Sequence, residues 1–400
     1  MTLSKTVQNA ELERPEMPNK KIFIIAGEVS GDTLGARIMR QMRNAEFAGI
    51  GGAEMTACGL KSIFPMSDLS VMGVIEVLAH ARTLSRRINQ TVDAIIKYAP
   101  DVILTIDSPG FARSVIKKLR KSAAGQKMIA RGLRFHHVVA PQVWAWRPGR
   151  AKKYARVFDK LYAFFDFEVP YFTKYGLDTV AVGHPIAEGL LGGDGVRAAD
   201  EKIITLVPGS RMGEVKRLLP VFREFIEKIP NVKEYKFAIP VVETTAEYVK
   251  SVVANWNVRP EIIPAAARYD LYRRTYIAVV ASGTVSAELA MLHVPAIVVY
   301  KMNRVTTWIG HLLIRVRWVS LVNILLNRAV YPEFLGERAT AENIARAFND
   351  MTKPDVREKV VSELRAADNM WVRTEGVPSK IIAESVSGYP SSLSSRHRLR

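Results

Sequence analysis

The sequence has almost no cysteine and no long apolar run. Cys58 is the only cysteine among 400 residues, which excludes an intramolecular disulfide and a cysteine-rich metal site, so a reducing compartment is the default. No uncharged apolar stretch approaches the roughly 18 residues needed to span a bilayer. The first twenty residues carry six charged side chains and no apolar core, so we expect no secretory signal. These absences predict a soluble protein, or one that lies on a membrane surface.

Acidic residues are scarce relative to basic ones. The 57 Lys and Arg outnumber the 39 Asp and Glu and give a formal net charge of +18 at pH 7. We therefore expect an anionic partner, which is a nucleic acid, a phosphorylated metabolite or an acidic lipid. Signatures of nucleic-acid recognition are missing, so phosphates and lipid are favoured and no nucleic-acid partner is expected.

Several motifs of familiar enzyme classes are also missing. There is no G-x-G-x-x-G turn, G-x-S-x-G elbow or P-loop, which argues against an NAD enzyme, an α/β-hydrolase and a P-loop enzyme. His136 and His137 are neighbours in an expected strand and point to opposite faces, so they do not share a metal. No D-x-D pair occurs, and Asp166–Glu168 is predicted to start a helix. The sequence predicts no metal site.

Short β-branched runs alternate with longer amphipathic stretches. The expected strands are Ile22–Ala26, Val102–Ile106, His136–Val139, Lys160–Phe164, Thr179–Val182, Ile203–Val207, Lys236–Ile239, Ile277–Val280 and Ala296–Val299. These runs are nearly all apolar, as expected when helices cover both faces of a parallel sheet. The pattern predicts an α/β fold with doubly wound parallel sheets.

One turn-rich stretch, residues 183–200, divides the chain into halves of similar length. We expect a loose arm over 1–19, an N-terminal domain over 20–185, a C-terminal domain over 186–350 and a loose tail over 388–400. In such folds ligands bind beyond the carboxyl ends of the strands, so two facing domains are expected to form a cleft there.

Two loops of the first half carry candidate functional residues. In the turn Gly27–Gly31 and at Gly35, glycines at a spacing of four keep the turn tight and let the next helix approach the sheet. This turn is either structural or contacts a ligand. Strand Val102–Ile106 ends at Asp107, whose carboxylate either acts as a general base or caps the following helix.

A third loop of the first half is rich in aromatic and cationic side chains. Gln142, Trp144, Trp146 and Arg147 lie between two prolines, and such residues are costly to expose without purpose. The loop therefore contacts a ligand or acyl chain, or it packs between elements.

Two loops of the second half suit a nucleotide diphosphate. In Pro208–Arg211, small residues precede a helix, so backbone N–H groups and the Arg211 guanidinium can grip phosphate. Ala281–Thr284 follows a second strand and adds hydroxyls, and Glu288, one turn further on, is placed for ribose hydroxyls.

Two apolar segments with basic neighbours suit a membrane surface carrying anionic headgroups. They are residues 71–78, which include Met72 and Glu76, and a helix from Arg304. Ordinary core packing is the alternative for both.

Taken together and in this order, five motifs resemble those of the bacterial lipid-A-disaccharide synthase family, glycosyltransferases with a GT-B fold. They are Gly27-Glu28-Val29-Ser30-Gly31-Asp32, Met72-Gly73-Val74-Ile75-Glu76-Val77-Leu78, Pro141-Gln142-Val143-Trp144-Ala145-Trp146, Pro208-Gly209-Ser210-Arg211 and Ala281-Ser282-Gly283-Thr284. The resemblance implies transfer of a diacylated glucosamine from UDP to an acylated glucosamine 1-phosphate, giving a β(1→6) disaccharide and UDP. It also implies action at the cytoplasmic face of the inner membrane, with no metal or other cofactor.

The resemblance implies that Asp107 is the base and that Arg211, Glu288 and Asn323 contact UDP, and the loops described above supply the other candidates. Asp107 is the expected base and Glu76 the competing one. The residues expected at the UDP-sugar are Gly209, Ser210, Arg211, Ser282, Gly283, Thr284, Glu288 and Asn323. Those expected at the acceptor and lipid are Gly27, Ser30, Gly31, Met72, Gln142, Trp144, Trp146 and Arg147. Helices over 351–387 are expected to cross back onto the first domain.

The chain departs from the family pattern at Gly110, Val322 and Gly336, where an acid, a proline and a glutamine are common. We expect an inverting, metal-independent glycosyltransferase. A UDP-sugar epimerase of the same fold and a non-catalytic lipid-binding scaffold are the alternatives, and a homodimer is left open.

Overall fold

The computed structural model describes residues 19–42, 44–69, 81–145, 147–190, 201–301 and 317–388. Both expected lipid-facing segments lie outside these ranges, as do Met72, Glu76 and Trp146. Across the described ranges, every helix is too short or too polar to cross a membrane.

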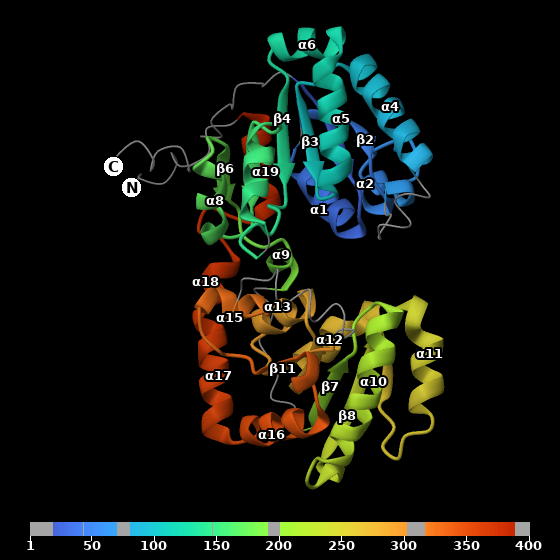
Figure 1. Ribbon diagram of the computed structural model, residues 1–400, viewed down its shortest axis with the longest axis vertical. Helices are drawn as coiled ribbons and strands as arrows, with labels where there is room; N and C mark the ends of the chain where they lie inside the picture. Colours follow the sequence, from blue (N-terminus) through green and yellow to red (C-terminus); the bar gives the residue numbers. More distant parts are fainter. Residues whose placement is uncertain are drawn as a thin grey trace, which may run out of the picture. The chain divides into compact units, whose positions relative to one another are not determined.

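The first six strands form one sheet in the order β2-β1-β3-β4-β5-β6 (Figure 1). They are β1 (Lys20–Ala26), β2 (Ala45–Ile50), β3 (Val102–Ile106), β4 (Arg134–Val138), β5 (Lys160–Ala163) and β6 (Asp178–Ala181). β1 runs parallel to β2 and β3, and β3 runs parallel to β4. Every residue of β3 is buried, as expected for a central strand covered on both faces.

Helices alternate with these strands. They are α1 (Val29–Gln41), α2 (Ala53–Ala57), α4 (Ala81–Tyr98), α5 (Pro109–Lys121), α6 (Ala123–Ala130), α7 (Ala151–Ala155) and α8 (Pro170–Thr173). Two glycines bring α1 close to its neighbours. A Cβ at Gly31 would lie 3.4 Å from the Ile106 carbonyl oxygen, and one at Gly35 would lie 2.6 Å from Met55 Sδ. Gly31 and Gly35 therefore let α1 pack closely against β3 and α2, which agrees with the structural alternative given for this turn.

The second sheet has the order β12-β11-β10-β7-β8-β9. Its strands are β7 (Lys202–Val207), β8 (Tyr235–Val241), β9 (Glu261–Pro264), β10 (Thr275–Ala281), β11 (Ala296–Tyr300) and β12 (Glu333–Leu335). The helices that follow residue 186 are α9 (Ala187–Leu190), α10 (Met212–Glu227), α11 (Glu243–Val253), α12 (Arg268–Arg273), α13 (Thr284–Met291), α15 (Leu321–Leu326), α16 (Ala341–Met351), α17 (Pro354–Ala366), α18 (Asp368–Trp371) and α19 (Pro378–Ser387).

Alternate residues of the second sheet enter two separate cores. Ile204 and Leu206 of β7 pack with α10, α11 and α16, whereas Ile203 and Val207 pack with α12, α13 and α17. Side chains alternate in this way along any strand, so the sheet is doubly wound (Figure 1).

All nine expected strands are confirmed, and the three that sequence patterns missed are edge strands. β2 includes Glu46 and Gly49 among its apolar residues, β9 ends in Pro264, and β12 has three residues. Edge strands are short and less apolar, so their hydrophobic signal is weak.

The chain divides into two compact units. One comprises residues 1–139, 156–161 and 382–400, and the other comprises 140–155 and 162–381. Residues 382–387 of α19 thus belong to the first unit. The expected domain boundary at 185 falls between the last strand of the first sheet and the first strand of the second, and it stays a prediction.

Candidate active site

The loops after β1 and β3 leave the first sheet side by side. Ala26 is in register with Ile106, and β2 lies on the other side of β1, so the strand order reverses here. Ligands bind at such reversals in open α/β sheets. A Cβ at Gly27 would lie 1.9 Å from Ser108 Oγ, so only glycine fits. Ser30, also expected at the acceptor, is exposed.

Asp107 lies at this reversal in a strained backbone conformation. Asp107 (φ 56°) and Ser108 (φ 44°) are both left-handed, which costs about 1–2 kcal/mol for each non-glycine residue. Asp107 N donates to the Val138 carbonyl oxygen at 3.2 Å, and Asp107 Oδ1 accepts from Ser108 N at 2.8 Å. Helix α5 has Ser108, not Asp107, as its N-cap. The alternative role of Asp107 as a helix cap is therefore wrong.

The strain continues on the neighbouring strand. Val139, directly after β4, has φ 80°, which is rare for a β-branched residue. Because β4 lies beside β3, left-handed non-glycine residues follow two adjacent strands. Strain of this kind persists where the surroundings hold it, and it gathers at active sites.

The aromatic loop is held by a buried carboxylate that sequence patterns missed. Trp144 Nε1 donates to Glu168 Oε1 at 3.3 Å, while Glu168 Oε2 accepts from Phe164 N at 3.0 Å and Phe165 N at 3.1 Å. Glu168 is 5% exposed. Burial raises its pKa to about 7, against the opposing effect of these hydrogen bonds.

The segment Asp166–Glu168 forms a 3-10 helix. The prediction that a helix starts here is confirmed. The contact of Glu168 with Trp144 could not be predicted from the sequence, because the two residues are 24 positions apart and only the fold brings them together. Gln142 and Arg147 of the same loop are exposed, and Arg147 is left-handed at φ 51°.

The two expected phosphate loops leave adjacent strands of the second sheet. β7 pairs with β10, with Val207 in register with Val280, and the strand order reverses between them. Gly209 has φ 98° and Gly283 has φ 152°, a region that favours glycine. The two loops are therefore neighbours at the carboxyl ends of β7 and β10.

Each of these loops opens a helix. Arg211 is the N-cap of α10 and Gly283 that of α13. Arg211 keeps 67% of its side chain exposed and pairs with Glu214 at 3.1 Å. A Cβ at Gly283 would meet nothing within 4 Å, so space is open beside this turn. Around it, Ser210 and Thr284 are exposed and Ser282 is half-buried.

Glu288 is buried on α13 with one oxygen unpaired. Its Oε1 accepts from Tyr269 Oη at 2.9 Å and lies 3.6 Å from Arg268 Nη2. Its Oε2 is buried without a hydrogen-bond partner in the described part of the chain. Burial raises the pKa of Glu288, and the Arg268 guanidinium opposes that effect. Sequence patterns missed Arg268 and Tyr269 because they missed β9, which precedes them.

Asn323, expected at the UDP-sugar, makes its side-chain hydrogen bonds within the protein. Its side chain is fully buried. Its Nδ2 donates to Tyr331 O and to Glu333 Oε1, both at 2.8 Å. Its Oδ1 accepts from Val330 N at 2.8 Å and Tyr331 N at 2.9 Å. An amide has two donors and two acceptor lone pairs, so Asn323 has none left for a ligand, and it fixes the chain before β12 instead.

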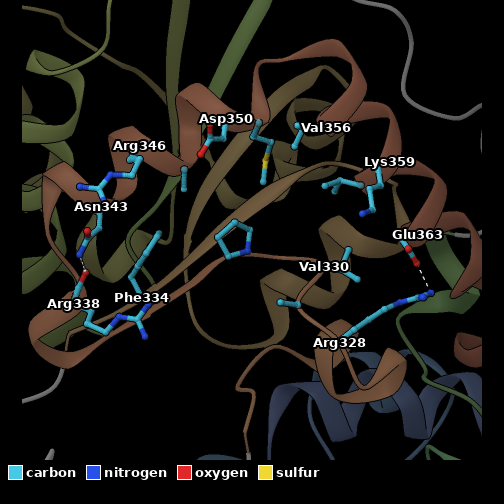
Figure 2. A pocket seen from close by; sticks show the side chains of 15 residues that line it. Arg328, Val330, Phe334, Arg338, Asn343, Arg346, Asp350, Val356, Lys359 and Glu363 are labelled. Atoms are coloured by element: carbon cyan, nitrogen blue, oxygen red, sulfur yellow. Dashed lines mark hydrogen bonds and ion pairs between the residues drawn. The ribbon is translucent and has the colours of Figure 1, made fainter.

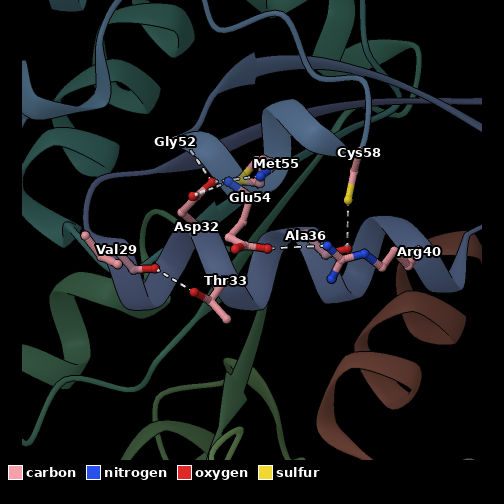
Figure 3. A network of polar contacts seen from close by, with 9 residues as sticks. All are labelled: Val29, Asp32, Thr33, Ala36, Arg40, Gly52, Glu54, Met55 and Cys58. Carbon is pink, nitrogen blue, oxygen red and sulfur yellow. Dashed lines mark hydrogen bonds and ion pairs between the residues drawn. The ribbon is translucent and has the colours of Figure 1, made fainter. Parts of the chain in front are cut away.

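Asp32, in the first of the family-like motifs, also has a structural role, because its carboxylate binds the start of helix α2 (Figure 3). Its carboxylate accepts from Gly52 N at 2.7 Å, Glu54 N at 2.9 Å and Met55 N at 3.1 Å. These amides open helix α2, so Asp32 anchors α2 to α1. Within the described ranges, no group of three His, Cys, Asp or Glu is placed to hold a metal ion.

Comparison with known proteins identifies the family. A model described as lipid-A-disaccharide synthetase matches residues 22–369. The chain belongs to the lipid-A-disaccharide synthase family. It is 39% identical over 381 residues to the lipid-A-disaccharide synthase of Rhodospirillum centenum, covering 91% of this chain and 93% of that protein. It is 37% identical over 393 residues to that of Granulibacter bethesdensis, covering 91% and 97%. The family is one of glycosyltransferases, so the chain is an enzyme of that class.

Solved structures share the fold at low identity. The S. aureus MnaA–UDP co-structure matches with a TM-score of 0.59 and 14% identity, covering 92% of this chain and 96% of that one. Acinetobacter baumannii MurG matches with a TM-score of 0.57 and 12% identity, covering 93% and 100%. The predicted α/β fold of GT-B type is confirmed.

Proposed function

We propose that this protein joins UDP-2,3-diacylglucosamine to 2,3-diacylglucosamine 1-phosphate with inversion, giving the β(1→6) disaccharide 1-phosphate and UDP. The observation that carries the proposal is the pair of glycine turns at the reversal of the second sheet, with the unpaired Glu288 Oε2 one helical turn beyond. A carboxylate oxygen without a donor suits the ribose hydroxyls of UDP.

The diphosphate of UDP binds at these turns. Arg211 is exposed at the start of a 16-residue helix, where backbone N–H groups and the helix dipole favour an anion. Negative charge develops on the diphosphate as the glycosidic bond breaks, and fixed donors stabilise it. Gly209, Ser210, Ser282, Gly283 and Thr284 shape this site.

Asp107 takes the proton from the acceptor hydroxyl as that oxygen attacks the anomeric carbon from the face opposite UDP. The proton ends on the carboxylate, the C–O bond to UDP breaks, and the product has the β configuration. The strained backbone fixes the direction of the carboxylate before the acceptor binds. Glu76 is the competing base.

The loop that Glu168 anchors binds the acylated acceptor through Trp144, Gln142 and Arg147, and we assign Trp146 to the same substrate. Gly27, Ser30, Gly31 and Met72 complete the acceptor side. The enzyme acts as a peripheral protein on the cytoplasmic face of the inner membrane, where both acylated substrates reside.

The test is an assay with both acylated substrates that detects UDP and the disaccharide. Asp107→Asn keeps the shape of the side chain and its acceptor oxygen, so UDP affinity should persist while kcat falls by about 10²–10⁴. Glu76→Gln is run beside it. If Asp107→Asn stays within a few-fold of normal kcat while Glu76→Gln loses activity, the base is Glu76. Epimerisation of the UDP-sugar without disaccharide would refute the proposed reaction.

A further inference from the structure

A cavity of about 760 Å³ lies at the β12 edge of the second sheet (Figure 2). Its walls are α16, α17, the chain from Arg328 to Pro332, and the segment Phe334–Arg338. None of the proposed substrate-binding residues lines it. Its volume falls within the range of ligand pockets, about 300–1,000 Å³.

The cavity wall carries an excess of positive charge. Both of its acids are already paired: Glu363 with Arg328 and Asp350 with Lys353 at 2.7 Å. Arg338, Arg346 and Lys359 are exposed, and none of the three makes an ion pair within the described ranges. Arg338 and Arg346 lie on the same side of the cavity with Asn343 between them, and Lys359 lies on the opposite side (Figure 2).

Between these sides the lining is mostly aliphatic, with the ring of Phe334 among its side chains. Val330, Met351 and Val360 are buried at the cavity wall, and Pro332 lies among them. Asn343 is the only uncharged polar side chain in the lining, and its Nδ2 already donates to the Arg338 carbonyl oxygen at 2.9 Å. A sugar or a nucleotide base needs several donors and acceptors, whereas an alkyl chain needs none.

We propose that this cavity binds a phosphate monoester that carries an alkyl or acyl chain. The phosphate is held by the guanidinium groups of Arg338 and Arg346, whose planar forks match phosphate oxygens in pairs. The chain lies along the aliphatic lining towards Lys359. This site is separate from the proposed nucleotide and acceptor sites and does not depend on the reaction assigned to them.

The experiment is calorimetry of the full chain with monomeric dodecyl phosphate, below its micelle concentration. The wild type should bind it, and the double variant Arg338→Ala/Arg346→Ala should bind about tenfold more weakly or worse, because charge-assisted hydrogen bonds are lost. Lys233→Ala/Arg259→Ala removes two exposed cations from the same unit, outside the cavity, and should bind normally. UDP affinity must stay unchanged in both variants, which shows that they fold.

Two further probes define the ligand class. Inorganic phosphate and dodecanol should each bind far more weakly than dodecyl phosphate. Vesicles that contain phosphatidic acid distinguish a membrane source from a soluble one, since a membrane source predicts the same loss in the double variant. The proposal is overturned if the wild type does not bind dodecyl phosphate, if the two double variants behave alike, or if inorganic phosphate binds as tightly.

Discussion

Replacing Glu168 by glutamine should abolish a pH-dependent loss of stability. Burial raises the pKa of this carboxyl from its ordinary 4.5 to about 7, a difference of about 2.5 pH units. At about 1.4 kcal/mol for each unit, the proton contributes about 3 kcal/mol. The side chain is 5% exposed, so solvent screens little of this energy.

The sign follows from proton binding. Between pH 4.5 and about 7 the folded protein keeps the Glu168 proton and the unfolded chain has lost it. The free energy of unfolding gains the full contribution below pH 4.5 and loses it as the pH rises through about 7. Buried histidines act oppositely. Burial lowers the pKa of His136 and His137 to about 3 and of His184 to about 4, so they add stability as the pH rises towards 6.5.

Urea unfolding at pH 5 and pH 8 separates these contributions. The histidine contributions are common to the wild type and Glu168→Gln, so the difference between their pH dependences isolates Glu168. We expect that difference to be about 2–3 kcal/mol, with the wild type losing more stability at pH 8. Glu243→Gln, at an exposed position, should match the wild type. Parallel curves for the wild type and Glu168→Gln, within about 1 kcal/mol, would refute the reasoning.

Three further changes test other parts of the structure. In Asp32→Asn, the new side-chain N–H₂ group faces the backbone N–H of Glu54, which donates to the carboxylate in the wild type. Thermal or urea unfolding should therefore show a free energy of unfolding lower by about 2–3 kcal/mol. Arg211→Ala should weaken UDP binding by about tenfold or more in calorimetry, and unchanged affinity would move the diphosphate elsewhere. Ser108→Gly removes a left-handed serine, so stability should stay level or rise by up to about 1 kcal/mol with kcat retained; a clear loss of stability would show that Ser108 is not strained.

The sequence was sufficient to predict the buried strands and the loops that follow them. Val102–Ile106 is apolar except for Thr105, so both its burial and the position of Asp107 at its end could be predicted. Glu168 could not be assigned, because its partner Trp144 is distant in sequence and only the fold joins them. The positive φ of Val139 has no local signal either, since β-branched residues avoid that region.

Two buried polar side chains of the unit that contains the second sheet differ in whether the protein satisfies their hydrogen bonds. Asn323 and Glu288 are both nearly inaccessible, at 0% and 6% exposed, and the family resemblance assigned both to the UDP-sugar. Asn323 meets each of its hydrogen bonds within the protein, so folding alone explains it. Glu288 has a buried oxygen with no donor, which costs free energy in the unliganded state. A ligand hydroxyl bound to this oxygen would recover that cost, which supports the proposal that Glu288 contacts the ribose of UDP and gives no such support for Asn323.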